Sequence, residues 1–436
     1  MEASVGRERR KGNNPPGGIA AWVRNSPLVR YPDLGLICIG IFIMLVGVGA
    51  VVPVRAIYAR NEGATLEEIG FMASSFLLGQ LLFQLPGGWA SDRWGRKPIM
   101  VAGVAIGGMI SFLFLLNDAP WYFIALRFVE GISSGVVAPA ANAYVIDTVP
   151  EKERGAAFGW LGSAFSAGFM MGPAIGGPMS DWLGYASPFI FGGVTSMITA
   201  AFLLFKMSNV RPGAIRKTVI PIEDIATTVP ITIEPEKRNR RIPKSLFVPA
   251  LIGSMAFTIA AGFGDGLFIS IWSIWLNDLH ASNSYIGLTF VIFSLPLMLF
   301  MPTTGKWADK GRLALLIAVP YTLVSSVYYV YAQTTDLFLI AAMGALEGTC
   351  LAISIPALSA FIADLSPDNA RGKLQGIFST VRTIAAFGSS IATALLYKGS
   401  IEAPFLALAI TQITISLIGG VVVYIVERRS RRTRGV

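Results

Sequence analysis

The sequence predicts an all-α integral membrane protein of twelve transmembrane helices, arranged as two six-helix repeats. Three observations lead to this fold class: an apolar composition, the number of long apolar runs, and an internal repeat. Of the 436 residues, 53% are hydrophobic and only 14% are charged, whereas a soluble domain usually carries about 25% charged residues. The mean hydropathy of +0.61 agrees with a chain that lies mostly in lipid.

Twelve apolar runs approach or exceed the roughly 20 residues that a membrane-spanning helix needs. The runs are 36–59, 69–91, 98–117, 120–148, 154–182, 188–207, 246–277, 284–307, 313–333, 336–364, 371–397 and 402–427. They form an N-terminal six-helix domain (36–207) and a C-terminal six-helix domain (246–427), separated by a polar linker (208–245) and flanked by tails (1–35 and 428–436).

The distribution of basic residues predicts the orientation in the membrane. Of the 35 Lys and Arg residues, 30 fall in the tails, the linker and the loops on the same side, and only Arg60 and Lys398 fall in loops on the other side. Because Lys and Arg accumulate in cytoplasmic loops, both termini are expected in the cytoplasm, as in a multi-pass protein of the plasma membrane. The net charge of +9 therefore reflects topology and does not indicate nucleic-acid binding.

The two halves repeat with an offset of 217 residues. Glu130-Gly131 matches Glu347-Gly348, and ten of the thirty positions in 130–159 are identical to their counterparts. Each half holds six spans and so enters the membrane in the same direction. Repeats of this kind are related by an axis along the membrane normal, with the substrate site between them.

Several charged residues lie deep in predicted spans. Such side chains are costly in lipid and usually mark a transport pathway. The candidates for proton coupling and substrate binding are Arg127, Glu130, Asp265, Glu347 and Arg382. Arg127 and Glu130 share a helix face and form either a coupling site or a static ion pair. Glu347 has Gly344 in place of a neighbouring arginine, which makes it a rival coupling acid, and Arg382 could pair with Glu347 or Asp265.

A motif follows the second run and reads Gly88-Trp-Ala-Ser-Asp92-Arg93-Trp-Gly95-Arg96-Lys97. Its glycines permit close packing and a turn, and its acid stands at a helix end. The pattern resembles the loop 2–3 signature of the major facilitator superfamily, which implies the major facilitator fold. The resemblance also implies that Asp92 and Arg96 form a charge relay with Asp147, a cytoplasmic latch that holds the outward-open form.

The second half carries a shorter and weaker copy of this motif, which we expect to form the lesser latch. Asp309 stands at the place of Asp92, and Asp364 stands at the place of Asp147.

The fifth run contains a glycine series: Gly159, Gly168, Gly172, Pro173, Gly176 and Gly177. Its spacing resembles the antiporter motif of the drug:proton antiporters within the same superfamily. The second half has no copy, since Ser389-Ser390 follow Gly172-Pro173 by 217 residues. Glycines at helical spacing also serve plain helix packing, which is the alternative interpretation.

Three further groups have alternative interpretations. Arg55, near the outer end of its span, either extends to the membrane interface or lines an outer gate. Trp272 and Trp275 form a wall for a lipophilic substrate or, as we prefer, an interface belt, and Tyr328, Tyr329 and Tyr331 are expected in such a belt. Cys38 and Cys350 are interpreted as small core residues, with no disulfide and no metal site.

The resemblance and the deep charges together predict a proton-coupled secondary transporter that exports lipophilic small molecules by alternating access, as in multidrug efflux. We expect no enzyme activity and no cofactor, since the chain has a single histidine and no phosphate-binding loop. The expected partners are the substrate, protons and the lipid bilayer, and the protein is expected to be a monomer. The alternatives are a lipid or lysolipid flippase, an organic-acid symporter in which Arg127 and Arg382 grip a carboxylate, and a non-transporting sensor.

Overall fold

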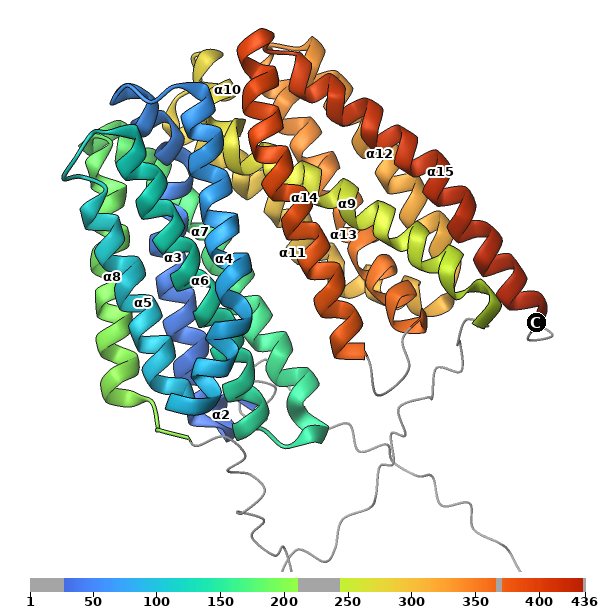
Figure 1. Ribbon diagram of the computed structural model, residues 1–436, viewed down its shortest axis with the longest axis horizontal. Coiled ribbons are helices and arrows are strands. Elements are labelled where there is room, and N and C mark those ends of the chain that lie inside the picture. The colour runs from blue at the N-terminus through green and yellow to red at the C-terminus, as the bar shows by residue number, and fades with distance from the viewer. Residues whose placement is uncertain (1–26, 211–243, 366–370, 434–436) are drawn as a thin grey trace, which may run out of the picture.

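The structure is a computed structural model that describes residues 27–210, 244–365 and 371–433 (Figure 1). The described residues form helices joined by short turns, in agreement with the predicted all-α membrane fold. The first half contains α2 (Pro27–Arg30), α3 (Pro32–Asn61), α4 (Leu66–Trp94), α5 (Arg96–Leu113), α6 (Pro120–Thr148), α7 (Arg154–Leu183) and α8 (Ala186–Lys206). The second half contains α9 (Phe247–Ser270), α10 (Trp272–Asp278), α11 (Asn283–Lys310), α12 (Leu313–Gln333), α13 (Leu337–Leu365), α14 (Arg371–Gly399) and α15 (Ala403–Thr433).

Ten helices in the described ranges are long and apolar enough to cross a membrane. α7 and α14 are not among these ten, although they contain 30 and 29 residues. At 1.5 Å per residue each is about 45 Å long, which exceeds the roughly 30 Å of the hydrocarbon core. Both are rich in small residues, and we assign them as the other two of the twelve predicted spans.

The helices pack in two groups, one from each half (Figure 1). Within the first group α4 packs on α6 and α3 packs on α7 and α8, and within the second α9 packs on α14, α11 on α13, and α12 on α15. The two groups meet mainly through two helix pairs, α7 with α11 and α4 with α14. In the repeat, α11 corresponds to α4 and α14 corresponds to α7. The two contacts between the halves are therefore equivalent.

Equivalent glycines make these two contacts. A Cβ atom on Gly70 of α4 would lie 3.1 Å from the carbonyl oxygen of Ser390, and one on Gly287 of α11 would lie 2.2 Å from the carbonyl oxygen of Pro173. Gly70 and Gly287 are 217 residues apart in the chain, and so are Pro173 and Ser390. The repeat found in the sequence therefore appears as a pseudo-twofold relation at the interface between the halves.

The halves approach closely on one side of the bundle only. We call the side at which α8 ends and α9 begins the linker side. Toward it the two groups diverge (Figure 1), and a Cβ atom added to Gly159, Gly305 or Gly376 would meet nothing within 4 Å. On the opposite side, the outer side, Arg60 Nη1 pairs with Asp278 Oδ1 across the halves at 2.5 Å. The structure therefore opens toward the linker side.

The seventh predicted span, 246–277, is not one continuous helix. α9 ends at Ser270 and α10 begins at Trp272, and between them Ile271 has φ −113° and ψ −12°, a distorted right-handed helical conformation. The expectation of a single span was wrong here, since the apolar sequence runs on through the break. The break lets Asp278, at the end of α10, accept a hydrogen bond from Tyr397 Oη at 2.6 Å.

Two helices extend beyond their predicted ends. α3 begins at Pro32, inside the segment expected as an N-terminal tail, and α15 continues to Thr433, inside the segment expected as a C-terminal tail. Proline is favoured in the first turn of a helix, and basic residues such as Arg428 and Arg429 are favoured in the last turns because they oppose the helix dipole.

Candidate functional site

Three charged residues of the first half form a buried group, the Arg55–Glu130–Arg127 triad. Arg127 Nη1 donates to Glu130 Oε2 at 2.8 Å, and Arg55 Nη2, from α3, donates to Glu130 Oε1 at 3.0 Å. Arg127 and Glu130 are one turn apart on α6, so the helix itself places them together. The ring of Phe76 lies 4.1 Å from the Arg127 guanidinium carbon, in a cation–π contact. One carboxylate thus serves two guanidinium groups.

Arg55 does not extend to the membrane interface, which was one of its two interpretations from the sequence. Its side chain is 12% exposed and bonds to Glu130. The contact joins residues 75 positions apart, and nothing in the α3 sequence identifies the partner.

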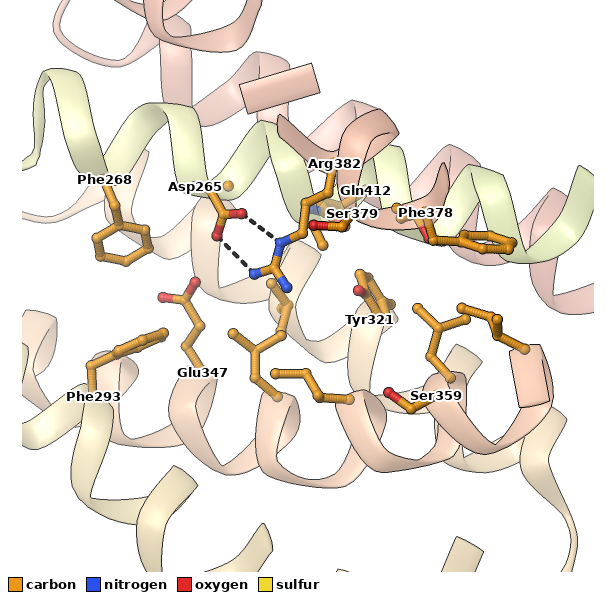
Figure 2. A pocket seen from close by; sticks show the side chains of 18 of the residues that line it. Asp265, Phe268, Phe293, Tyr321, Glu347, Ser359, Phe378, Ser379, Arg382 and Gln412 are labelled. Atoms are coloured by element: carbon orange, nitrogen blue, oxygen red, sulfur yellow. Dashed lines mark hydrogen bonds and ion pairs between the residues drawn. The ribbon is translucent and has the colours of Figure 1, made fainter. Parts of the chain in front are cut away.

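In the second half, Asp265 of α9 and Arg382 of α14 form a two-point ion pair (Figure 2). Arg382 Nε donates to Asp265 Oδ2 at 2.6 Å, and Arg382 Nη2 donates to Asp265 Oδ1 at 3.0 Å. Both side chains are partly exposed, to 44% for Arg382 and 36% for Asp265. The sequence left two partners open for Arg382, and the structure pairs it with Asp265.

Glu347 of α13 has no cationic partner among the residues that the structure describes. It is 1% exposed, and its carboxyl oxygens accept hydrogen bonds from Tyr328 Oη at 2.9 Å and from Tyr331 Oη at 3.3 Å. The expected interface belt was wrong for these two tyrosines, which are buried. Of the three tyrosines, only Tyr329, which is 56% exposed, points outward as a belt residue would. Positions 328 and 331 share a helix face, a signal that could have separated them from 329.

Two cavities contain these charges. The central cavity, about 450 Å³, lies between the halves and is lined by the triad from one side and by Asp265 and Arg382 from the other. A second cavity of about 200 Å³ lies within the second half and is lined by Asp265, Arg382 and Glu347 (Figure 2). The Asp265–Arg382 pair thus borders both cavities, and Glu347 borders the second.

The two tryptophans of α10 pack in the protein core. Trp272 and Trp275 are 2% and 1% exposed, so the preferred interpretation as an interface belt was wrong. Their rings lie 5.2 and 5.6 Å from the ring of Tyr331, and Trp272 Nε1 donates to Thr289 Oγ1 at 3.1 Å. The two tryptophans therefore pack against Tyr331 and do not line either cavity.

The motif between α4 and α5 forms a compact polar network. Arg96 is 6% exposed, and its Nε donates to Asp147 Oδ2 at 2.8 Å while its Nη1 donates to Asp92. The structure therefore brings together the three members of the expected latch. All three belong to the first half, and the Asp92 side chain is 64% exposed at the linker side.

The other residues of this motif have smaller parts. Gly95 adopts φ +100° and makes the turn from α4 to α5. Close packing was expected at Gly88 and is found instead at Gly87, which lies against Val136, whereas nothing lies within 4 Å of a Cβ atom on Gly88. The guanidinium of Arg93 lies 5.5 Å from the ring of Trp89.

In the second-half copy of the motif, Asp364 is half-buried near the end of α13. The side chain of Asp309 lies outside the described part of the chain.

The glycine series makes close helix contacts along most of α7. A Cβ atom on Gly172 would lie 2.5 Å from Gly49 Cα, and one on Gly176 would lie 1.9 Å from the Ala50 carbonyl oxygen, both on α3. Gly177 faces the other half, where its Cβ would lie 2.3 Å from the Asn283 carbonyl oxygen. Gly168 also contacts α3, whereas Gly159 meets nothing. α7 is thus packed between α3 of its own half and α11 of the other.

The sequence pattern of the Major Facilitator Superfamily matches residues 37–263 and 254–436. The chain belongs to this superfamily. It is therefore a multi-pass membrane protein and a secondary transporter, as expected from the sequence, and the superfamily consists of transporters and not of enzymes.

Two relatives of this superfamily member align along most of their length. An uncharacterised transporter of Methanocaldococcus jannaschii is 26% identical over 362 residues, which cover 83% of this chain and 90% of the relative. The quinolone resistance protein NorA of Staphylococcus aureus is 23% identical over 397 residues, which cover 90% of this chain and 95% of NorA.

Solved structures share the fold of this superfamily member. A bacterial homologue of the human lysosomal transporter Spinster, in an inward-facing and occupied conformation, superposes with a TM-score of 0.68 at 15% identity, covering 93% of this chain and 97% of that one. A POT family transporter in complex with 5-aminolevulinic acid superposes with a TM-score of 0.72 at 14% identity, covering 93% and 98%.

Proposed function

We propose that this protein exports lipophilic small molecules in exchange for protons, and that Glu347 carries the proton. The observation that carries this proposal is the difference between its partners and those of the other two deep acids. Glu130 and Asp265 pair with arginines, whereas Glu347 contacts two neutral tyrosine hydroxyls.

The partners decide which acid can exchange a proton. A guanidinium favours the charged carboxylate, so Glu130 and Asp265 are poor proton carriers. A tyrosine hydroxyl can donate to a carboxylate or accept from a carboxylic acid. The site of Glu347 therefore accommodates both protonation states, as a carrier requires.

Coupling to the substrate runs through Asp265 and Arg382. All three residues line the second cavity, and the Asp265–Arg382 pair also borders the central cavity. Loss of the Glu347 proton places a second negative charge near Arg382 and weakens its bond to Asp265. The wall of the central cavity then changes with the protonation of a residue that the substrate does not contact.

The orientation of the chain supports loading from the cytoplasm. The excess of basic residues in the tails and the linker indicates that the linker side is cytoplasmic. The described form opens toward that side, where an exporter in the plasma membrane takes up its substrate. Similarity to a quinolone resistance protein favours export of drug-like molecules.

The test is proton release driven by substrate. The purified protein is reconstituted inside-out in liposomes with an acidic lumen that contains a pH-sensitive dye, and a panel of lipophilic drugs is added. We expect proton efflux in the wild type and none in Glu347→Gln. The matched control is Glu402→Gln, which makes the same change at an exposed acid outside both cavities. Wild-type coupling in Glu347→Gln would refute the assignment.

The same experiment separates the alternative functions. A response only to lysolipids would identify a flippase. Uptake of an organic acid together with protons would identify a symporter. Either result would keep the transporter fold and replace the substrate class.

A further inference from the structure

The charges that line the central cavity do not balance. Three guanidinium groups, of Arg55, Arg127 and Arg382, face two carboxylates, of Glu130 and Asp265. Glu347 lines the second cavity and is not part of the central wall. Among the described residues of this wall, positive charges therefore exceed negative charges by one. The sequence alone suggested no such imbalance, because Arg55 was expected at an outer position.

The surplus lies in the first half. Asp265 and Arg382 form a one-to-one pair with two hydrogen bonds. In the triad, by contrast, Glu130 is shared by two arginines, and the Nε atoms of both Arg55 and Arg127 are buried without a hydrogen-bond partner. The two guanidinium groups therefore share one carboxylate, and the positive charge left at this end of the wall attracts an anion.

Most of the rest of the central wall is apolar and aromatic. Phenylalanines from both halves line it: Phe76, Phe169, Phe268, Phe290 and Phe293. Pockets for drug-sized ligands occupy about 300–1,000 Å³, and the central cavity, at about 450 Å³, falls in this range. Phe76 also covers the Arg127 guanidinium, so an apolar surface and a cation meet at one point.

We infer that the central cavity selects amphiphilic anions with a single negative charge. The acidic group binds at the Arg55–Arg127 side, and the aromatic or aliphatic body packs against the phenylalanines. This inference rests on the proposed export function and names its substrate class. It assigns Arg55 as the residue that sets the preference, because without Arg55 the guanidinium and carboxylate groups of the wall are equal in number.

Equilibrium binding tests the preference without any transport step. The probes are 2-naphthylacetic acid, its neutral amide and 2-(2-naphthyl)ethylamine, titrated into the detergent-solubilised protein by isothermal titration calorimetry. We expect the acid to bind at least tenfold more tightly than the amide, and the amine to bind most weakly. Equal affinities, or tightest binding of the amine, would overturn the inference.

Variants locate the preference. Arg55→Gln should remove the advantage of the acid over the amide, because the positive and negative charges of the wall are then equal in number. Arg55→Lys should retain the advantage. Lys206→Gln removes an exposed cation that lies outside the cavity and should change nothing. An acid preference that persists in Arg55→Gln would refute the role of Arg55.

The pH-dye experiment of the preceding subsection keeps the two proposals apart. If neutral or cationic drugs drive proton release that depends on Glu347 while the acid shows no binding advantage, the export function stands and the anion preference fails. If the acid binds with the expected preference but no compound moves protons, proton coupling fails and the selectivity of the cavity stands.

Discussion

Glu130 and Glu347 occupy equivalent positions of the two repeats, and their surroundings give them different chemistry. Glu130 accepts from two guanidinium groups, whereas Glu347 accepts from two phenolic hydroxyls. Charged partners hold an acid in one state, and neutral partners that can both donate and accept leave two states open. The duplication has thus given one acid charged partners and the other neutral partners, the difference on which the proposed proton site at Glu347 rests.

The tyrosine hydroxyls of α12 should promote release of the Glu347 proton, because they donate hydrogen bonds to the carboxylate that the release leaves behind. A hydrogen bond to a charged group contributes about 1.5–3 kcal/mol, and about 1.4 kcal/mol corresponds to tenfold. In Tyr328→Phe we therefore expect substrate-driven proton release to slow about tenfold or more. Substrate affinity should change little, because Tyr328 borders the second cavity and not the central cavity.

The control for this variant lies one residue further along the helix. Tyr329→Phe removes the same hydroxyl from a side chain that is 56% exposed and should leave proton release unchanged. Equal rates in Tyr328→Phe and the wild type would contradict the role of the hydroxyl.

The sequence located most of the deep charges but not their partners. A charged residue in an apolar run stands out by itself, so Glu130, Asp265, Glu347 and Arg382 could be found by position alone. Their partners depend on how distant helices pack, and Arg382 and Asp265 are 117 residues apart. Only the pair within one helix, Arg127 and Glu130, followed from spacing, because one turn of helix fixes it.

Among the elements, α7 shows how small residues set the distance between helices. Its glycines place the backbone against α3, while Ser389 and Ser390 take the equivalent positions in α14. There Ser390 and Ser74 form a hydrogen bond between the halves at 2.6 Å, and Ser389 donates to the Phe263 carbonyl oxygen at 2.7 Å. The contact of α7 with α3 in the first half is therefore made by close backbone approach, whereas in the second half Ser389 joins α14 to α9 by a hydroxyl hydrogen bond.

Adding one methyl group to α7 should have opposite effects at two positions. In Gly176→Ala the new Cβ would lie 1.9 Å from the Ala50 carbonyl oxygen, so α3 and α7 must separate. Overpacking of this kind costs about 1–3 kcal/mol. Gly159→Ala meets nothing within 4 Å and should stabilise the helix by about 0.5–1 kcal/mol. Thermal unfolding in detergent should show a lower midpoint for the first variant and an equal or higher midpoint for the second.

This comparison also bears on the meaning of the glycine series. A lower midpoint for Gly159→Ala would show that another group packs against Gly159 in solution. A normal midpoint with reduced transport would indicate that Gly159 needs space only when the linker side closes.

The apolar runs of the sequence predicted most helices, but they did not predict the helix break at Ile271. The run 246–277 is mostly apolar on both sides of Ile271, yet the helix is interrupted there. The break allows the tryptophans of α10 to fill the space beside Tyr331 and Phe405, a space that exists only after α12 and α15 have packed. Such a break depends on tertiary contacts and leaves no mark in the local sequence.

In the whole molecule, polar contacts join the two halves on the outer side. Asp181, at the end of α7, accepts hydrogen bonds from the backbone N–H groups of Asn283 at 3.1 Å and Ser284 at 2.7 Å, at the start of α11. A carboxylate at this place also opposes the positive end of the α11 dipole. Arg60 and Asp278 add an ion pair between the halves at 2.5 Å. In alternating access these contacts must break when the outer side opens.

Removing the charge of Asp181 should therefore shift the protein toward the form that is open on the outer side. In Asp181→Asn the bonds to the α11 N–H groups weaken, and the described form loses stabilisation that the other form does not depend on. Spin labels at Ser163 and Thr303, exposed positions of α7 and α11 toward the linker side, report the change, and the two native cysteines are buried. We expect pulsed electron–electron double resonance to show a larger population of short distances between the two labels in Asp181→Asn than in the wild type. The control is Asp336→Asn, because Asp336 accepts from the Phe338 N–H within its own half. An unchanged distance distribution in Asp181→Asn would show that this contact does not contribute to the balance between the two forms.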